Sequence, residues 1–261
     1  MPLFPCVVIL RMTQFPEALK DWRTRRRFSQ LELSVQADVS ARHIAFLETG
    51  RARPSAEMVS RLADALQIPM HERNQLLTLA GFAARYPGRP WNDPVMAPVR
   101  GAVERTLKQH APYPAIAVDR LWTVMLMNDP ARGLFGAVGL AEGGSLLDLM
   151  VSETLPPMIE NWPDVAHHAA QRLRIESASQ GGVPRLDRAA EKLAAVPGAS
   201  TARTGPVVPT IYRAGQLRLS LFAIIAQFGT PEDLLLEDMK IELFFPADDE
   251  TDRALRAGWN T

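Results

Sequence analysis

Apolar side chains recur at spacings of three and four residues along residues 15–83, which is the period of helices that bury one face. Two kinds of signal divide this stretch. Ser29 and Glu32 in "SQLE" form a capping box, whose hydroxyl and carboxylate accept free amides at a helix start. Gly50 ends another helix, because glycine enters the left-handed conformation at low cost. The pattern predicts five helices, over about residues 15–27, 29–37, 40–49, 54–68 and 71–80.

The pattern changes after residue 83. The segment "ARYPGRPWNDPV", residues 84–95, holds three prolines and a glycine, which is typical of a linker. Helical spacing returns near Met96, and "YPAIAVDRLWTVMLMN" then predicts two strands around a turn at Asp119 and Arg120. Three more strands are predicted from "VVPTIYR" and "LRLSLFAIIAQF", which "AGQ" joins, and from "KIELFFPAD", which Pro246 ends.

Helical segments separate these strands. "PARGLF" and most of residues 152–198 have helical spacing, with a loop at Gly181 and Gly182. "TPEDLLLEDM" predicts a capped turn or short helix that begins at Thr230, and the carboxylates of "PADDETD" predict a solvated tail.

The chain is therefore predicted to join two domains. The first is all-helical, over residues 12–83, and a linker follows at residues 84–95. The second, over residues 96–261, is α+β, with an antiparallel sheet of about five strands flanked by helices. Residues 1–11 are a possible start-site extension, because Met12 could equally be the first residue.

Composition narrows the class of protein. Hydrophobic residues make up 47% of the chain and charged residues 22%, as in soluble globular proteins. Cys6 stands alone, which excludes an intramolecular disulfide and a cysteine-based metal site and favours a cytoplasmic protein. The apolar run near residue 8 is too short to span a bilayer, so no membrane is expected as a partner. Residues 1–90 hold 13 Lys and Arg against 8 Asp and Glu, and residues 91–261 hold 16 Lys and Arg against 21 Asp and Glu. The N-terminal part is therefore basic and suits a polyanion as its partner.

The second and third predicted helices, joined by "DVS", form a helix-turn-helix, in which the start of the third helix enters the major groove of DNA. Ile44 and Leu47 should be buried. Arg42 could donate a bidentate pair to guanine and His43 a single hydrogen bond. Alternatively, Arg42 and His43 could lie on a solvated surface that binds nothing. The capped second helix, the short link, the second cap and Gly50 occur in the order of a helix-turn-helix, and this order favours contacts with DNA. The predicted contacts are Ser40, Ala41, Arg42, His43 and Phe46 at base edges, Gln30 on a phosphate or as a buttress, and Arg51, Arg53 and the run Arg23 to Arg27 on phosphates.

These residues resemble a known family. "FSQLELS" and "ADVSARHIAFLETGRARPSAEMVSRLADAL" are similar to the XRE class of Cro/repressor-like helix-turn-helix domains. "RHIAFLETGRARPS" followed by "IPMHERNQLLTLAGFAARY" resembles the branch with an MmyB-like ligand-binding domain, and "HAPYPAIAVDRLWTVMLMN" and "FGTPEDLLLEDMKIELFFPADDET" continue the resemblance. It implies a PAS-like C-terminal fold, a transcription factor that binds DNA as a dimer, and a fatty acid as ligand.

The C-terminal domain offers no catalytic pattern, since it lacks cysteine, an HExxH motif and a glycine loop for phosphate, and no cofactor or metal is expected. His167 and His168 diverge on a helix and are expected at the surface. Flexible and aromatic side chains could line a pocket or serve as ordinary core. The candidates are Trp122, Met125, Met127, Met158, Trp162, Tyr212, Phe222 and Phe228, with Arg213, Arg218 or Tyr212 available for the carboxylate of an acyl chain.

The sequence therefore predicts a non-enzymatic, dimeric regulator of transcription. Two copies would place their third helices in successive major grooves of a two-fold operator, and a small apolar ligand, such as a fatty acid, would change operator affinity. The alternative is a DNA-binding repressor whose C-terminal domain only mediates dimerisation or recruits a partner protein.

Overall fold

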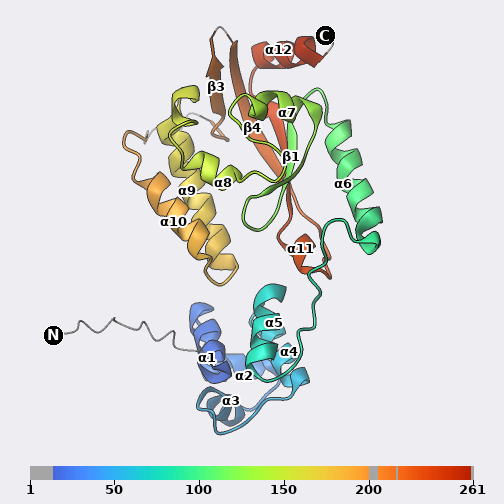
Figure 1. Ribbon diagram of the computed structural model, residues 1–261. Helices are drawn as coiled ribbons and strands as arrows, with labels where there is room; N and C mark the ends of the chain where they lie inside the picture. Colours follow the sequence, from blue (N-terminus) through green and yellow to red (C-terminus); the bar gives the residue numbers. More distant parts are fainter. Residues whose placement is uncertain (1–13, 200–204, 216, 260–261) are drawn as a thin grey trace, which may run out of the picture. The chain divides into compact units, whose positions relative to one another are not determined.

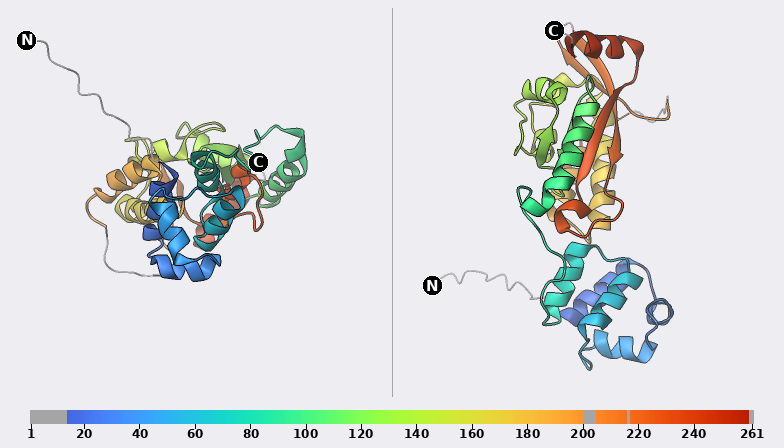
Figure 2. Two further views of the ribbon diagram at one scale, coloured as in Figure 1. Left: turned by 90° about the horizontal axis from the view of Figure 1, so that it is seen from below. Right: turned by 90° about the vertical axis from the view of Figure 1, so that its right-hand side faces the viewer.

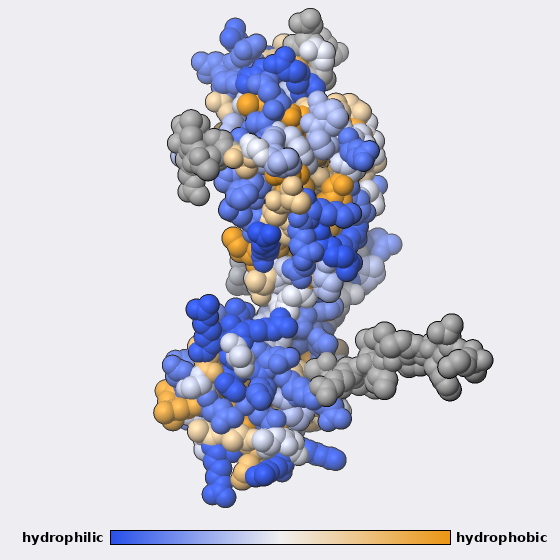
Figure 3. Space-filling view, turned by 90° about the vertical axis from the view of Figure 1, so that its left-hand side faces the viewer, coloured by the Kyte–Doolittle hydropathy of each residue, from blue (hydrophilic) through white to orange (hydrophobic). Residues whose placement is uncertain are grey.

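The computed structural model describes residues 14–199, 205–215 and 217–259, so the predicted start-site extension lies outside the described residues. The chain forms two compact units that divide between Tyr86 and Pro87 (Figure 1). The face drawn in Figure 3 is mainly hydrophilic, and its apolar residues form small separate patches. Among the helices of the described residues, none combines the length and apolar character that crossing a bilayer requires.

In its described residues, from Gln14 on, the first unit consists of five helices around one apolar core, as predicted. Leu19, Leu33, Ile44 and Leu47 are completely buried at its centre. Serines cap three helix starts, because their hydroxyls accept an amide that has no partner within the helix. The helices are α1 (Phe15–Arg25), α2 (Gln30–Ala37), α3 (Ala41–Glu48), α4 (Ala56–Ala65) and α5 (Met70–Leu79).

Local hydrogen bonds fix the turn between α2 and α3 and the end of α3. The capping box is present: Ser29 Oγ accepts from the Glu32 amide at 3.1 Å, and the Glu32 carboxylate accepts from the Ser29 amide at 2.6 Å. Asp38 ends α2 in the left-handed conformation, with φ at 50°. Gly50, with φ at 71°, lets the next amide reach the Phe46 carbonyl at 2.8 Å, which is the pattern of a Schellman cap. The orientation of α3 is therefore set at both of its ends.

The second unit is built on a five-stranded antiparallel sheet with the order β2-β1-β5-β4-β3. The strand number and the antiparallel pairing agree with the sequence prediction. The strands are β1 (Ala115–Val118), β2 (Val124–Met127), β3 (Thr210–Ala214), β4 (Leu217–Ala226) and β5 (Lys240–Pro246).

Helices cover the two faces of this sheet differently (Figure 1; Figure 2, right). Alternate residues of β1 and β5, such as Ala117 and Ile241, face α6. The opposite residues, such as Ile116 and Phe244, face α9, with α10 packed alongside it. The helices of this unit are α6 (Ala97–Gln109), α7 (Asp129–Gly136), α8 (Leu146–Met150), α9 (Trp162–Ser179), α10 (Pro184–Ala194), α11 (Leu234–Glu237) and α12 (Asp249–Trp259), with short 3₁₀ turns η1 (Pro94–Met96) and η2 (Pro156–Met158).

Three sequence predictions are wrong in detail. The expected solvated tail after β5 forms α12, because Asp248 caps its start and Thr251 is buried, where its hydroxyl accepts from the Ser220 amide at 2.9 Å. The short helix expected from Thr230 begins after Asp233, whose carboxylate accepts from the Leu235 amide at 3.0 Å. The strand expected from Val207 begins at Thr210, since Pro209 has no amide to donate to a sheet.

Candidate functional site

The start of α3 presents polar and aromatic side chains that the fold leaves accessible. Ser40 and Arg42 are exposed, and Ala41, His43 and Phe46 are half-buried. The Arg42 guanidinium lies 5.3 Å from the centroid of the Phe46 ring, a cation–π contact that holds it along the outer face of α3. Ile44 and Leu47 are completely buried on the other face, as predicted. The structure therefore brings the predicted base-reading residues together on one surface.

A buried carboxylate that the sequence analysis did not single out fixes α3 to α1 and α2. Glu48 Oε1 and Oε2 accept from Arg23 Nε at 2.6 Å and Nη2 at 2.9 Å, and Oε2 also accepts from Gln30 Nε2 at 2.8 Å. Burial alone would raise the pKa of Glu48, but the hydrogen bonds from Arg23 and Gln30 outweigh it and hold the pKa below its usual range. Gln30 thus acts as the buttress, one of its two predicted roles.

Two arginines of the run at the end of α1 bind groups within the first unit. Arg23 binds Glu48, and Arg26 donates to the carbonyls of Leu66 at 3.0 Å and Gln67 at 2.9 Å. These two side chains hold α1 to its neighbours, so the prediction that the whole run meets phosphates does not fit them. Arg51 and Arg53, which follow the Schellman cap, are exposed.

The second unit contains a cavity of about 500 Å³ between α7, α12 and the β3–β4 hairpin. Its walls are mostly aliphatic, with Leu134, Val138 and Leu255 among the lining residues. Arg213 lies in the lining and donates to Glu160 through Nη2 at 2.6 Å, which lowers the pKa of that carboxylate. We call this the acyl cavity, because an apolar chain with an anionic end would match its lining.

A smaller cavity of about 220 Å³ lies between the inner face of the sheet and helices α8 and α9. We call it the aromatic cavity. Phe135 and Tyr212 line both cavities, with their ring centroids 6.5 Å apart in an edge-to-face arrangement. Burial raises the pKa of the Tyr212 hydroxyl, which keeps it neutral. These two rings therefore form a shared wall.

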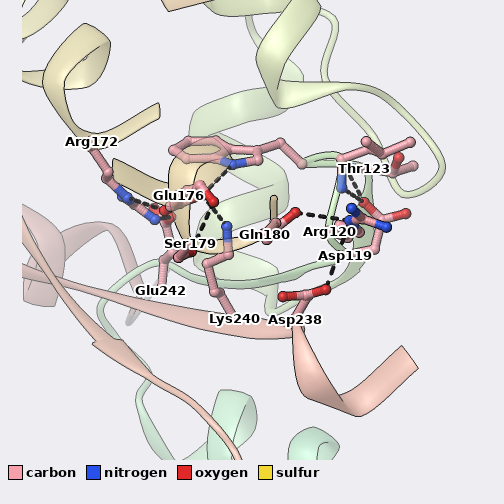
Figure 4. Close-up of polar contacts among 12 residues, drawn as sticks. Asp119, Arg120, Thr123, Arg172, Glu176, Ser179, Gln180, Asp238, Lys240 and Glu242 are labelled. Atoms are coloured by element: carbon pink, nitrogen blue, oxygen red, sulfur yellow. Dashed lines mark hydrogen bonds and ion pairs between the residues drawn. The ribbon is translucent and has the colours of Figure 1, made fainter. Parts of the chain in front are cut away.

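Four charged side chains pair with one another (Figure 4), and we call Arg172, Glu176, Lys240 and Glu242 the charged cluster. Two of them, Arg172 and Glu242, line the aromatic cavity. Arg172 donates to Glu176 Oε1 at 2.9 Å and to Glu242 Oε1 at 2.5 Å, and Lys240 Nζ also contacts Glu176. Burial would raise the pKa of Glu176, but Lys240 and Arg172 outweigh it and lower that pKa. The Trp122 indole donates to Glu176 Oε2 at 2.9 Å, and Arg172 stacks 4.4 Å from its ring centroid.

The predicted ligand residues separate into lining and core. Trp122, Trp162, Tyr212 and Phe222 line the aromatic cavity, and Met158 lines the acyl cavity with Tyr212. The prediction is wrong for three residues that line neither cavity. Met125 and Phe228 pack in the cluster with α6, on the opposite face of the sheet, and Met127 is buried in the main core.

The charged cluster was not predicted from the sequence, although β5 carries a signal for it. Lys240 and Glu242 alternate with Ile241 and Leu243 in "KIEL", so both charges face the same side of the strand. Arg218, expected to meet a carboxylate, pairs with Glu160 at 3.4 Å. Among the described residues, no group of three or more His, Cys, Asp and Glu is arranged to hold a metal ion.

Comparisons with known proteins agree with this division into two units. Residues 99–257 match the model of the MmyB-like transcription regulator ligand binding domain, and residues 19–72 match that of a helix-turn-helix. No curated protein matches the chain. A solved structure of an RNA-binding light-oxygen-voltage receptor is similar over 93% of this chain and 62% of that chain, at 13% identity and a TM-score of 0.28. The chain belongs to the family of MmyB-like transcription regulators, with a helix-turn-helix domain joined to an MmyB-like ligand-binding domain.

Proposed function

We propose that two copies of this chain bind a two-fold operator and that an acyl ligand in the C-terminal domain changes their affinity for it. The surface at the start of α3 carries the proposal. Arg42 and His43 stand beside each other there, while Glu48 at the other end anchors α3 to α1 and α2. A reading helix needs this combination, because base-edge contacts lose specificity when the helix that bears them is loosely held.

The short reading helix supports the proposed dimer. At 1.5 Å per residue, the eight residues of α3 extend for about 12 Å, so one copy contacts only part of a helical turn of DNA. Two copies related by two-fold symmetry would read half-sites roughly 34 Å apart. Two linked reading helices would also bind the operator more tightly than either helix alone.

An open edge of β4 supports self-association of the second unit. Among the described residues, β3 pairs with β4 only as far as Leu221, and no strand pairs beyond it on the side away from β5. The unpaired segment includes Ala223, Ile224 and Ile225, and the two isoleucines are 51% and 41% exposed. An apolar strand edge is a template for pairing with a second copy.

The acyl cavity supports a fatty acid as the ligand. A cavity of about 150 Å³ accommodates benzene, or about 25 Å³ per carbon, so about 500 Å³ has room for a chain of up to about 20 carbons. The aliphatic lining suits the chain. Arg213 also lies in the lining and donates to Glu160 through Nε and Nη2, so its Nη1 is the donor that would meet the ligand carboxylate. The ligand would shift operator affinity only as far as it binds one dimer geometry better than another.

The DNA-reading role is tested by selecting operator sequences from a random pool and titrating them by fluorescence anisotropy. Arg42→Ala should weaken operator binding about 5- to 150-fold and relax specificity at one position, because each bidentate pair discriminates by about 1–3 kcal/mol. Arg53→Ala is the matched control, since a phosphate contact weakens operator and random DNA alike. Equal losses on both DNAs from Arg42→Ala would remove Arg42 from the base-reading set.

The ligand role is tested by native mass spectrometry of the full chain with tetradecanoate. Gly133 lines the acyl cavity on α7, and a Cβ built there meets nothing within 4 Å. Gly133→Leu should therefore fill the cavity and abolish the adduct, while the helix gains stability from losing a glycine. Gly136→Leu is the control, because Gly136 lies on the same helix outside the cavity lining. A dimer without an adduct would favour the alternative, a C-terminal domain that only dimerises or recruits a protein.

A further inference from the structure

The aromatic cavity differs from the acyl cavity in both size and lining. Its volume is about 220 Å³, less than half that of its neighbour. Aromatic rings form a larger share of its walls than in the acyl cavity, beside aliphatic side chains. Its polar lining residues are His168, Thr210 and, from the charged cluster, Arg172 and Glu242. The aromatic residues of the lining are Trp122, Phe135, Trp162, Tyr212, Phe222 and Phe244.

Glu242 brings an unused acceptor to this cavity. The residue is only 4% exposed, and its Oε1 accepts from Arg172 Nη2 at 2.5 Å. Its Oε2 accepts no hydrogen bond from any described residue, and Arg172 Nη1 donates none. This oxygen keeps some accessible surface, since it is not among the buried unpartnered atoms of the described residues. A ligand that covers it without donating leaves it unsatisfied, whereas a ligand that donates to it avoids that cost.

The balance of charge at this end of the cavity selects a neutral ligand. The charged cluster has two cations, Arg172 and Lys240, and two carboxylates, Glu176 and Glu242, which pair directly with one another. A carboxylate or ammonium ligand would give this neutral cluster a net charge beside a largely apolar cavity, and an uncompensated charge there opposes binding. A pure hydrocarbon would cover Glu242 Oε2 and leave it unsatisfied.

The volume limits the ligand to about one or two fused rings. A cavity of about 150 Å³ accommodates one benzene ring, so about 220 Å³ accommodates a bicyclic molecule with its edge at Glu242. Planar rings also suit the aromatic walls, because offset and edge-to-face contacts add to the burial of apolar surface.

We infer that the aromatic cavity binds a small neutral aromatic molecule of one or two fused rings, with an N–H or O–H that donates to Glu242 Oε2. This second site rests on the proposed function in taking the C-terminal domain as ligand-binding, and it is separate from the acyl cavity. The shared wall of Phe135 and Tyr212 lets an occupant of either cavity contact the same two rings. The domain would therefore respond to two chemically different ligands.

The test is isothermal titration calorimetry of the full-length protein with three probes of nearly equal shape. Indole has the donor, benzofuran lacks it, and indole-2-carboxylate adds a charge. Indole should bind at one saturable site per chain. Benzofuran should bind about 5- to 100-fold more weakly, because it leaves Glu242 Oε2 without a donor, and indole-2-carboxylate should also bind more weakly than indole.

Matched variants locate the site. Ala169 lines the aromatic cavity on α9, so Ala169→Leu should abolish indole binding, whereas Ala178→Leu, at an exposed position of the same helix, should not. Leu149→Phe, on α8, is a second cavity-filling variant if Ala169→Leu does not fold. Gly133→Leu should retain indole binding while losing tetradecanoate.

Four results would overturn the inference: no saturable indole binding, equal affinity for benzofuran, indole binding that survives both folded cavity-filling variants, or displacement of indole by tetradecanoate. Tetradecanoate and indole binding together distinguish a failure of this inference from a failure of the proposed function. If tetradecanoate does not bind but indole binds as described, the acyl ligand is wrong and the second site stands. If tetradecanoate binds and indole does not, only the second site is wrong.

Discussion

Replacing Glu48 by glutamine tests whether one buried carboxylate holds the reading helix in place. The side chain is only 3% exposed and accepts three hydrogen bonds, two from Arg23 and one from Gln30. Glutamine has the same shape but only one acceptor oxygen. Its NH2 group would face at least one of the N–H donors of Arg23 and Gln30, where it cannot accept a hydrogen bond. Breaking a buried ion pair costs about 3–5 kcal/mol, and the remaining bonds recover part of this, so we expect a loss of about 2–3 kcal/mol.

Hydrogen exchange in the full-length protein measures this loss locally, because the two units need not unfold together. A loss of 2 kcal/mol should speed exchange of the most protected amides of α1–α3 about 30-fold. Glu57→Gln is the matched control, since Glu57 is 85% exposed and lies 3.6 Å from Arg61, so it should change exchange less than about twofold. An equally small effect of Glu48→Gln would refute the reasoning.

The same carboxylate predicts a dependence on pH. Its contacts hold the pKa of Glu48 below the unfolded value of about 4.3. The folded protein therefore binds fewer protons than the unfolded chain near that pH. The stabilisation is complete above about pH 5 and is lost as the pH falls through the folded pKa. Wild type and Glu48→Gln should thus differ most near neutral pH and converge in acid.

Three further predictions concern other parts of the fold. Burial, followed by the charge of Glu237, raises the pKa of Asp238 to about 6, so the folded state holds an extra proton between about pH 4 and 6. Stability of the second unit should therefore fall as the pH rises through 6, and Asp238→Asn should remove this slope in thermal denaturation series at different pH values. Ile224→Lys should weaken dimerisation in analytical ultracentrifugation, because it places a charge on the open edge of β4, and an unchanged dissociation constant would exclude that edge. Ser29→Ala should destabilise α2 by about 1 kcal/mol in urea titrations, and a negligible change would show that the capping box contributes little.

The helix boundaries of the first unit could be predicted because local chemistry fixes them. Ser29 caps the helix it was expected to begin, Ser40 and Ser55 cap the starts of the next two helices, and Gly50 takes the left-handed conformation. Each of these signals depends on neighbours within a few residues. The pairing of Arg23 with Glu48 depends on residues 25 positions apart, which no local pattern specifies.

The ligand cavities could be predicted only in part, because residue type does not say which face of the sheet a side chain occupies. Trp122 and Tyr212 line the aromatic cavity, whereas Met125 and Phe228 face α6 instead. That assignment requires the order and register of five strands, and the last three lie beyond residue 209, far along the chain from the first pair. Similarly, the carboxylates after β5 predict a solvated tail, but they lie on a helix whose other face carries the buried Thr251.

The central claim is that an acyl ligand in the C-terminal domain changes the affinity of the reading helices for DNA. The most direct measurement is an anisotropy titration of the selected operator with and without saturating tetradecanoate, for wild type, Gly133→Leu and Gly136→Leu. We predict that the ligand changes the operator dissociation constant by at least about fivefold in wild type and Gly136→Leu and leaves Gly133→Leu unchanged. Identical titrations with and without tetradecanoate, in wild-type protein that carries the ligand by mass spectrometry, would contradict the claim.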